Sequence, residues 1–332
     1  MPSDHTKRKI ASPLVFTQLL IGILLQQPAQ AKALGAVASH HDHTEHYLRM
    51  PVHVITMTTD EAEYVEGLKM FEISFNRTRN IDTPMDMEVI QTTKEKFWEL
   101  GWKSKLLYVL KSLRRVPHHQ LVIWADSKDI VWLPCGRDMR QIFKEFDHDI
   151  VIGSCPFQYP DQFKEELFPD VPVMKPEIEF TEESNKTYYE YKYINAGFIM
   201  GRAGALIHYL GGSFLRYGAV DTVDYFNDQA FWANMYLAQF YDDAISASRH
   251  PSIAIDSGFM AVSQGAYNYD PVGDTGYWQS DKSRFTTCVA HASGGPDNYD
   301  PLFEFYNTSW ANSFDWEAAQ AEVAKAADID SV

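Results

Sequence analysis

Between residues 121 and 131 the sequence reads Leu121-Val122-Ile123-Trp124-Ala125-Asp126-Ser127-Lys128-Asp129-Ile130-Val131. Its apolar run, with β-formers among the residues, predicts a buried strand, and Asp126 and Asp129 follow that strand three positions apart. Open α/β sheets bind ligands at the edge where their strands end, so both carboxylates are predicted at a binding edge. Two hard oxygen ligands on a tight turn suit Mg²⁺ or Mn²⁺, and such an ion commonly bridges the phosphates of a nucleotide. An ordinary Asp-rich turn after a strand gives the same pattern.

The composition indicates a folded globular protein. The 332 residues are 45% hydrophobic and 14% aromatic, enough for one large α/β domain or two small ones. The formal net charge of -16 disfavours a nucleic-acid partner, because phosphate backbones are bound by clustered Lys and Arg. Any phosphate site therefore has to be built locally, by a metal ion or by a few selected cations.

Apolar periodicity predicts alternating strands and helices from Val52 to His291. Besides the strand that ends at Asp126, strands are expected at 52–58, 87–90, 149–154, 193–201, 252–255 and 285–289, and helices at 59–75, 105–113, 136–146 and 230–240. This order predicts an α/β fold, a Rossmann-like α/β/α sandwich with a mostly parallel mixed central sheet. No Gly-x-Gly-x-x-Gly follows the first strand and no Walker loop is present, so dinucleotide oxidoreductases and P-loop enzymes are disfavoured.

The N-terminal segment is typical of a targeting signal. Residues 1–31 combine a basic flank, an apolar run from Ile10 to Leu25 and small residues before a cleavage position, which predicts a secretory signal peptide. An uncleaved signal anchor is the alternative, although the run is short for a membrane span of about twenty residues. Residues 32–50 are predicted to be a His-rich linker, residues 51–310 the folded domain and residues 311–332 a C-terminal helical tail. We therefore expect the protein in the secretory pathway, in the ER or Golgi lumen, or secreted.

Two further features bear on that compartment. Sequons at Asn76, Asn185 and Asn307 agree with it weakly, since such triplets also arise by chance. The three cysteines, Cys135, Cys155 and Cys288, allow one disulfide within the chain, and the sequence leaves the pairing open.

Several other residues are candidates for a site. Lys105 falls in the first turn of a predicted helix, where a cation is unfavourable unless an anion is near. Asn195 and Gly197 lie where backbone can approach a ligand closely. Asp228 precedes a helix, where capping alone explains a carboxylate. His291, at a strand end in a Gly-rich loop, is either a third metal ligand or a structural histidine.

The motifs, in this order, resemble the glycosyltransferase domain of the multifunctional procollagen lysyl hydroxylases, a GT-A-type domain that uses a UDP-sugar. The resemblance runs from about Val52 to Asn307. It rests on these segments: Ile55 to Thr58, Gly101 to Lys105, Leu121 to Val131, Ser154 to Asp161, Asn195 to Ile199, Asp228-Gln229 and His291 to Pro296.

The resemblance implies a role for each matching residue. Asp126, Asp129 and His291 would hold Mn²⁺ or Mg²⁺ against the UDP diphosphate, and Asp228 would be the catalytic acidic residue beside the transferred sugar. The donor-binding residues would be Thr56, Thr58, Lys105, Asn195, Gly197, Gln229, Ser293 and Gly295. The carboxylate of Asp228 would orient sugar hydroxyls, stabilise an oxocarbenium-like centre or act as the base for the acceptor, and the sequence does not choose among these roles.

Lys128 stands where the family usually has an aromatic residue that stacks on the uracil. The chain also ends without the hydroxylase domain, so no iron and no 2-oxoglutarate are expected. We expect a metal-dependent transfer of a hexose from a UDP-sugar to a protein or glycan hydroxyl, with hydroxylysine of a collagen-like chain as an acceptor that the resemblance implies. A secreted nucleotide-sugar-binding protein of the same fold without turnover is the main alternative, and a metal phosphohydrolase is a third. Contact with a membrane is expected only if residues 1–31 are retained as an uncleaved signal anchor.

Overall fold

The computed structural model describes residues 50–156, 158–159, 162–169, 191–213, 227–241, 250–264, 269–273, 275–280, 285–293 and 296–310, together with 315, 317–319 and 321. The predicted signal segment, nearly all of the His-rich linker, the sequon at Asn185, Gly295 and most of the predicted tail helix lie outside these residues. Within them, no helix combines the length and the apolar character needed to cross a membrane.

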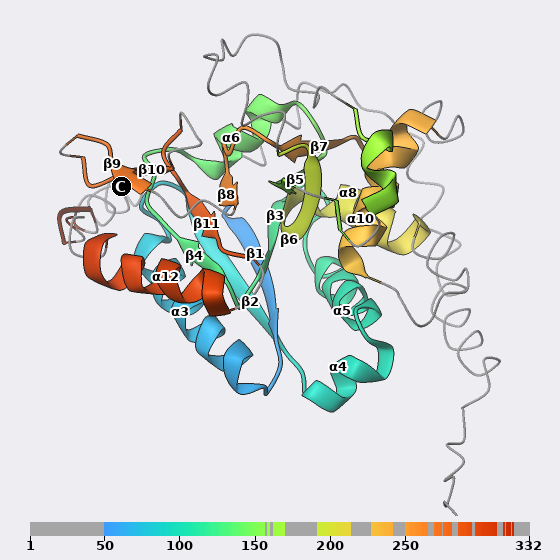
Figure 1. Ribbon diagram of the computed structural model, residues 1–332, viewed down its shortest axis with the longest axis horizontal. Coiled ribbons are helices and arrows are strands. Elements are labelled where there is room, and N and C mark those ends of the chain that lie inside the picture. The colour runs from blue at the N-terminus through green and yellow to red at the C-terminus, as the bar shows by residue number, and fades with distance from the viewer. Residues whose placement is uncertain are drawn as a thin grey trace, which may run out of the picture. The chain divides into compact units, whose positions relative to one another are not determined.

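The core of the fold is a six-stranded sheet with the strand order β2-β1-β3-β6-β5-β7 (Figure 1). These strands are β1 (Val52–Thr58), β2 (Met85–Gln91), β3 (Leu121–Asp126), β5 (Ile150–Cys155), β6 (Tyr193–Arg202) and β7 (Ile253–Asp256). β6 runs antiparallel to β3 and β5, whereas the β1–β2, β1–β3 and β5–β7 pairs are parallel. The predicted mixed, mostly parallel sheet is therefore confirmed.

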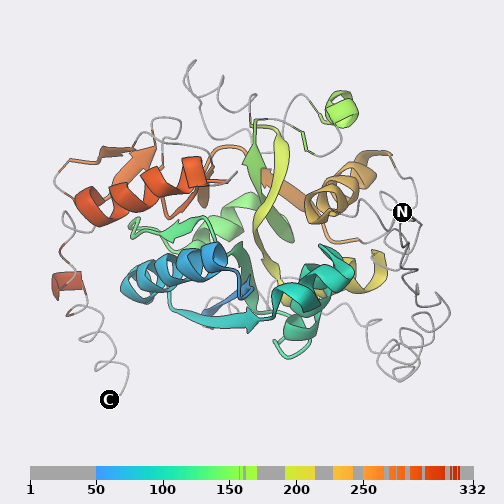
Figure 2. The same ribbon diagram turned by 60° about the horizontal axis from the view of Figure 1, so that its bottom comes forward.

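Helices cover both faces of this sheet (Figures 1 and 2). Successive strand residues point to opposite faces: Ile55 and Trp124 pack in one core cluster, and Val54 and Ile123 pack in the other. The first cluster includes residues of α5 (Lys103–Leu113), α8 (Ala203–His208) and α10 (Asp228–Tyr241), and the second includes residues of α3 (Ala62–Thr78) and α6 (Met139–Phe146). The central strands read as continuous apolar runs because both of their faces are buried.

A second, smaller sheet lies beside the C-terminal end of β3. It has the order β4-β11-β8, with β4 (Ile130–Trp132), β11 (Val289–His291) and β8 (Val262–Gln264). β11 pairs antiparallel with β4 and parallel with β8. A disulfide joins Cys135, just after β4, to Cys288, just before β11. Cys155 is buried outside this disulfide, and its Sγ donates to the carbonyl oxygen of Ile194 at 3.2 Å. The sequence alone does not decide between this pairing and one with Cys155.

The remaining elements complete the layers. They are α4 (Lys94–Leu100), α12 (Pro296–Phe305), the β9 (Tyr269–Pro271) and β10 (Trp278–Ser280) hairpin, and the short helical segments η2 (Gln162–Leu167), η3 (Tyr209–Ser213) and η4 (Tyr306–Trp310).

Several predicted boundaries were wrong. The strand expected at 285–289 is β11 at 289–291, because β4 offers only three residues to pair with, and Thr286 makes a single bridge to Gln279 instead. The helix expected from residue 136 begins at Met139, where the Asp138 side chain accepts a hydrogen bond from Arg140 N. The helix expected from residue 230 begins at Asp228.

A pair of histidines at the end of α8 predicts a pH-dependent stability. His208 Nε2 lies 2.7 Å from His250 Nδ1, and burial together with the neighbouring imidazole lowers the pKa of His208. His208 therefore binds a proton more tightly in the unfolded chain than in the folded protein. The contribution of neutral His208 to the free energy of unfolding is complete above about pH 6.5, and it is lost as the pH falls through the lower pKa of the folded state. Between pH 7.5 and 5, we expect the Tm of a His208→Gln variant to fall by about 1–2 °C less than that of the wild type. Parallel Tm curves for the two proteins would contradict this assignment.

Candidate functional site

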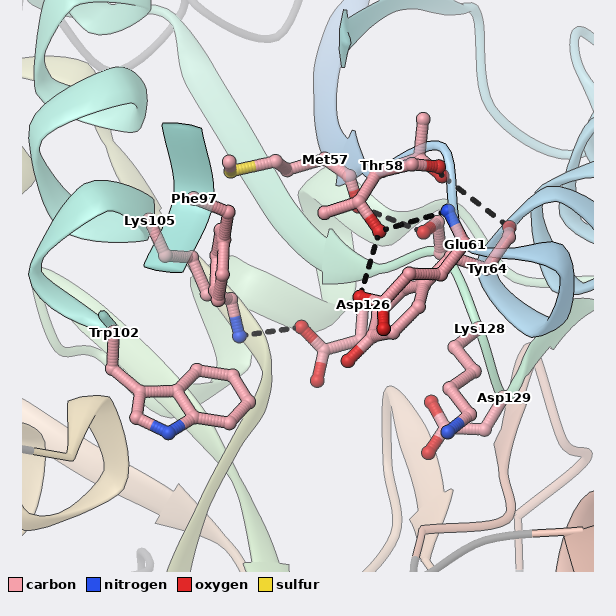
Figure 3. Close-up of a pocket in the computed structure, with 12 residues that line it drawn as sticks. Met57, Thr58, Glu61, Tyr64, Phe97, Trp102, Lys105, Asp126, Lys128 and Asp129 are labelled. Atoms are coloured by element: carbon pink, nitrogen blue, oxygen red, sulfur yellow. Dashed lines mark hydrogen bonds and ion pairs between the residues drawn. The ribbon is translucent and has the colours of Figure 1, made fainter. Parts of the chain in front are cut away.

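A pocket of about 310 Å³ opens at the C-terminal ends of β1 and β3 (Figure 3). It is lined by Met57, Thr58, Thr59, Glu61, Tyr64, Phe97, Trp102, Lys105, Asp126, Ser127, Lys128 and Asp129. This is the edge that the sequence predicted for ligand binding, because parallel strands end there and the following loops gather.

Asp126, Asp129 and His291 come together beside this pocket. One possible ligand atom from each residue lies within 4.8 Å of those of the other two. The β4–β11 ladder brings this about: Ile130 pairs with His291, and Ala292 N donates a 2.9 Å hydrogen bond to the carbonyl oxygen of Asp129. The predicted meeting of two acids with a histidine more than 150 positions later is therefore present.

The atoms of this cluster fit a metal ion. His291 is 2% exposed, and neither of its ring nitrogens nor Asp129 Oδ1 has a hydrogen bond of good geometry within the described part of the chain. Nε2 of His291 and Oδ1 of Asp129 face each other at 3.2 Å. Buried polar atoms without partners are costly, and a divalent cation between imidazole and carboxylates satisfies them.

Electrostatics in the cluster point the same way. Burial lowers the pKa of His291, but the negative charges of Asp129 and Asp126 outweigh it and hold that pKa above its ordinary value. The site thus attracts a positive charge onto or beside the imidazole, which is what a cation-binding site requires.

Gly197 makes room for His291. β6 bulges against β5, because Ile152 pairs with Ile199 whereas the next residue, Gly153, pairs with Asn195. A Cβ on Gly197 would lie 2.2 Å from His291 Cε1 and 2.8 Å from its Nε2. The Asn195 side chain fixes the bulge, since its Oδ1 accepts a 2.8 Å hydrogen bond from Gly197 N. Of two predicted donor-binding residues, Gly197 therefore lies against the histidine of the metal cluster, and Asn195 holds Gly197 in place.

Lys105 joins the metal cluster to Asp228. Its Nζ lies 2.6 Å from Asp126 Oδ1 and 2.7 Å from Asp228 Oδ2, and the lysine is 7% exposed. Burial lowers the pKa of Lys105, but the two carboxylates outweigh it and hold the pKa well above the ordinary value, so the lysine is cationic. The anion that a cation in the first turn of α5 requires is thus supplied by these two aspartates.

Asp228 is the first residue of α10 and is buried. Asn227 caps the helix, because its Oδ1 accepts hydrogen bonds from Gln229 N and Ala230 N, which leaves Oδ2 of Asp228 for Lys105. Gln229, predicted to bind the donor, donates from Nε2 to the carbonyl oxygen of Tyr159 at 3.3 Å.

The other predicted donor-binding residues are placed differently. Thr58 lines the pocket, whereas Thr56 has no exposed surface and its hydroxyl donates to the carbonyl oxygen of Ala125 at 2.7 Å. Thr56 thus ties β1 to β3 beneath the pocket. Ser293 lies two residues after His291 in a turn, and Gly295 is outside the described residues.

Tyr64 is a site residue that the sequence misplaced. It lies at helical spacing with the apolar residues Leu68 and Phe71 of α3, a pattern typical of a core face, but its ring lines the pocket. Lys128 Nζ lies 5.1 Å from the centroid of that ring and 2.9 Å from Glu63 Oε2. An aromatic ring is therefore present at the wall of the pocket beside Lys128, supplied by a different element.

Phe97 and Trp102 line the pocket as well. Their ring centroids are 5.6 Å apart and nearly perpendicular, and Trp98 completes an aromatic group with both. Two hydrogen bonds fix α4, from Ser104 Oγ to the carbonyl oxygen of Phe97 and from Lys94 N to Asp60 Oδ1. The sequence missed α4 because a seven-residue helix gives little periodic signal.

Replacing Lys105 with methionine should destabilise the metal-free protein. The change leaves Asp126 and Asp228 close together without the positive charge that they share. We expect the free energy of unfolding to fall by about 2 kcal/mol. This is below the usual range for a broken buried ion pair, because Asp126 is partly exposed. Mn²⁺ should restore part of the loss by neutralising Asp126. Urea unfolding with and without Mn²⁺ measures both effects. Lys111→Met, an exposed change on the same helix, is the control and should cost under about 0.5 kcal/mol.

Comparison with known proteins shows a structural similarity to glycosyltransferases. The chain is similar to the crystal structure of a glycosyltransferase involved in the glycosylation of the major capsid of PBCV-1, with 11% identity and a TM-score of 0.44 over 77% of this chain and 100% of that one. It is also similar to the apo structure of the bifunctional glycosyltransferase WbbM, with 12% identity and a TM-score of 0.39 over 88% of this chain; the match spans 53% of WbbM. No known family model and no curated protein sequence matches the chain. With similarity this distant, function has to be argued from the site itself.

Proposed function

We propose that the protein is a metal-dependent glycosyltransferase that moves a hexose from a UDP-sugar to a hydroxyl acceptor. The observation that carries the proposal is the cluster of Asp126, Asp129 and His291 at the edge of a pocket with aromatic walls. Within the described part of the chain, the His291 ring nitrogens and Asp129 Oδ1 are buried without a hydrogen bond of good geometry. A divalent cation and a nucleoside diphosphate are the ligands that satisfy both features together.

Charge supports a divalent cation. Asp126, Asp129 and Asp228 bring three carboxylates, and Lys105 offsets one of these charges, so two negative charges remain within this group of residues when His291 is neutral. One Mn²⁺ or Mg²⁺ held by Asp126, Asp129 and His291 would neutralise that excess and would attract the phosphate groups of a nucleotide. Lewis-acid stabilisation of the departing diphosphate is the chemistry that the ion supplies when bound.

The aromatic walls suit a nucleobase. The ring of Tyr64 lies on one side of the pocket and the rings of Phe97 and Trp102 lie on the other (Figure 3). Aromatic side chains stack on bases, with about 1–3 kcal/mol per base in single-stranded nucleic-acid complexes. The aromatic residues and Asp126 line the same pocket. A nucleotide whose base stacks on the aromatic rings could therefore reach Asp126 with its diphosphate.

Lys105 and Asp228 would act on the sugar side. The ammonium group of Lys105 lies between the metal cluster and Asp228, where it offsets negative charge that develops on the leaving phosphate oxygen. Asp228 is buried and contacts Lys105, which lines the pocket, through Oδ2. From this position its carboxylate would contact the transferred hexose or the acceptor hydroxyl once the donor is bound.

We also propose that the protein works in the secretory pathway. The disulfide between Cys135 and Cys288 supports this, because disulfides form and persist in oxidising compartments. The signal-like segment at residues 1–31 is the sequence feature that agrees with it.

The test is donor cleavage. Purified protein is incubated with UDP-glucose, UDP-galactose or UDP-glucuronate in Mn²⁺ or in EDTA, and UDP release is measured with and without hydroxyl acceptors, including hydroxylysine peptides. We expect release with at least one donor in Mn²⁺ and a loss of about 1,000-fold in EDTA. If the protein bound UDP with Mn²⁺ but released UDP from none of the donors, it would be a nucleotide-sugar-binding protein and not an enzyme. UDP release that is equal in EDTA would end the metal proposal.

A further inference from the structure

The disulfide closes one end of a short ladder whose other end carries two metal ligands. Cys135 follows β4 and Cys288 precedes β11, and these strands lie side by side (Figure 1). The ladder has three residue pairs, Trp132 with Val289, Val131 with Ala290 and Ile130 with His291, and the last pair contains one of the two ligands. At about 3.3 Å per residue the sulfur bridge is roughly 10 Å from the cluster.

The disulfide itself sits in fixed surroundings. Both cysteines are buried. Asp82 Oδ2 accepts hydrogen bonds from Cys135 N at 2.7 Å and from Gly136 N at 3.0 Å, and Leu133 N donates to the carbonyl oxygen of Cys288 at 2.9 Å. Because the bridge is anchored in this way, it holds one end of the ladder in a single arrangement.

The metal cluster depends on this ladder more than on any local sequence. Asp129 and His291 come from segments more than 150 positions apart, and β4 and β11 have three residues each. β8 completes this small sheet, but each of its strands has three residues, so each strand pair contributes few backbone hydrogen bonds. A metal site, in contrast, requires ligand distances to be right within about 0.2 Å.

We propose that the disulfide between Cys135 and Cys288 is a positioning element of the metal site: by locking the β4–β11 ladder, it holds Asp129 and His291 at coordinating distance and raises the affinity for a divalent cation. This inference rests on the metal cluster of the proposed function. It adds that the redox state of two buried cysteines outside the pocket sets how tightly the site binds its ion.

The coupling has to work in both directions. If the disulfide strengthens metal binding, the metal stabilises the disulfide by the same factor. Reduction by dithiothreitol adds two electrons and two protons, turns the S–S bond into two thiols and leaves cyclic oxidised dithiothreitol. Saturating Mn²⁺ should therefore raise the ratio of reduced to oxidised dithiothreitol at which half of the protein is reduced.

The first experiment compares Mn²⁺ affinities by electron paramagnetic resonance. The full-length wild type, a Cys135→Ala/Cys288→Ala variant and a Leu206→Ala variant are titrated at a temperature where circular dichroism shows all three folded. Leu206 is fully buried in the core cluster on the other face of the sheet, so its truncation lowers stability without touching the ladder. We expect about 10-fold weaker binding by the cysteine variant and wild-type binding by Leu206→Ala. Cys155 is the one cysteine left in the variant, so no new bridge within the chain can form.

The outcomes separate this inference from the proposed function. Equal affinity of the wild type and the cysteine variant overturns the inference and leaves the metal site standing. A wild type that binds no Mn²⁺ defeats the proposed function, and the inference with it. If the cysteine variant does not fold, the dithiothreitol titration of the wild type decides: a shift of about 10-fold with Mn²⁺ supports the coupling, and an unchanged ratio overturns it.

Discussion

A Gly197→Ala variant is expected to bind Mn²⁺ about 100-fold more weakly than the wild type. The new methyl group would lie 2.2 Å from His291 Cε1, a distance that the two groups cannot keep. His291 is packed against Asp129 at the end of β11, so the ring has to rotate or the strand has to move, and either movement takes Nε2 away from the cluster. Titration with Mn²⁺ measures the loss directly.

Gly211→Ala is the matched control for this prediction. A Cβ on Gly211 meets nothing within 4 Å, so the same chemical change there should leave Mn²⁺ affinity unaltered. A double-mutant cycle identifies the path: in a His291→Ala background, Gly197→Ala should have little further effect. If Gly197→Ala bound Mn²⁺ like the wild type, the proposed contact between Gly197 and a metal-binding His291 would be wrong.

An Asp129→Asn variant is expected to lose donor cleavage by about 1,000-fold or more. The substitution keeps the shape of the side chain but removes a charge from a buried position beside His291. A neutral amide coordinates a divalent ion weakly, so the variant should also need a far higher Mn²⁺ concentration for whatever activity remains. Release of UDP from the donor, measured over a range of Mn²⁺ concentrations, gives both the loss of activity and the Mn²⁺ concentration that the variant needs.

Stability distinguishes this effect from unfolding. Asp129→Asn removes the repulsion between Asp129 and Asp126 together with the attraction between Asp129 and His291, so the variant should unfold at a temperature close to that of the metal-free wild type. Glu145→Gln on α6, a change in an exposed carboxylate away from the pocket, should leave activity intact. An Asp129→Asn protein that cleaves the donor at the wild-type rate would show that Asp129 is not a metal ligand.

The central sheet could be predicted from sequence because its signals are local. The run from Leu121 to Ala125 is apolar throughout since both faces of β3 are covered, and Asp126 marks where that cover ends. The positions of Asp126 and Asp129 at a binding edge follow from that one strand. Local pattern also located β1, α5 and β6 within a few residues.

The parts that were not predictable depend on contacts between distant segments. β4 and β11 have three residues each, too few for a periodic signal, and their pairing decides where His291 lies. The bond between Cys135 and Cys288 spans 153 positions, and nothing local distinguishes it from a pairing with Cys155. Tyr64 fits the apolar spacing of α3, yet its ring lines the pocket. The sequence could not reveal this, because it does not show where the sheet beneath the helix ends.

Lys105 is an intermediate case. Its unfavourable place in the first turn of α5 indicated a nearby anion, and the resemblance assigned that anion to the donor. The structure provides Asp126 and Asp228 instead, from a strand and a helix that meet only in the folded chain. The donor phosphates would then approach a lysine whose charge is already shared between two carboxylates.

The most direct measurement is a crystal structure with Mn²⁺ and UDP, in which anomalous scattering locates the ion. We expect one strong anomalous peak within about 2.3 Å of oxygens of Asp126 and Asp129 and a nitrogen of His291, with the diphosphate on the open side of the ion and the uracil near Tyr64. A peak elsewhere, or UDP bound away from these three residues, would contradict this expectation.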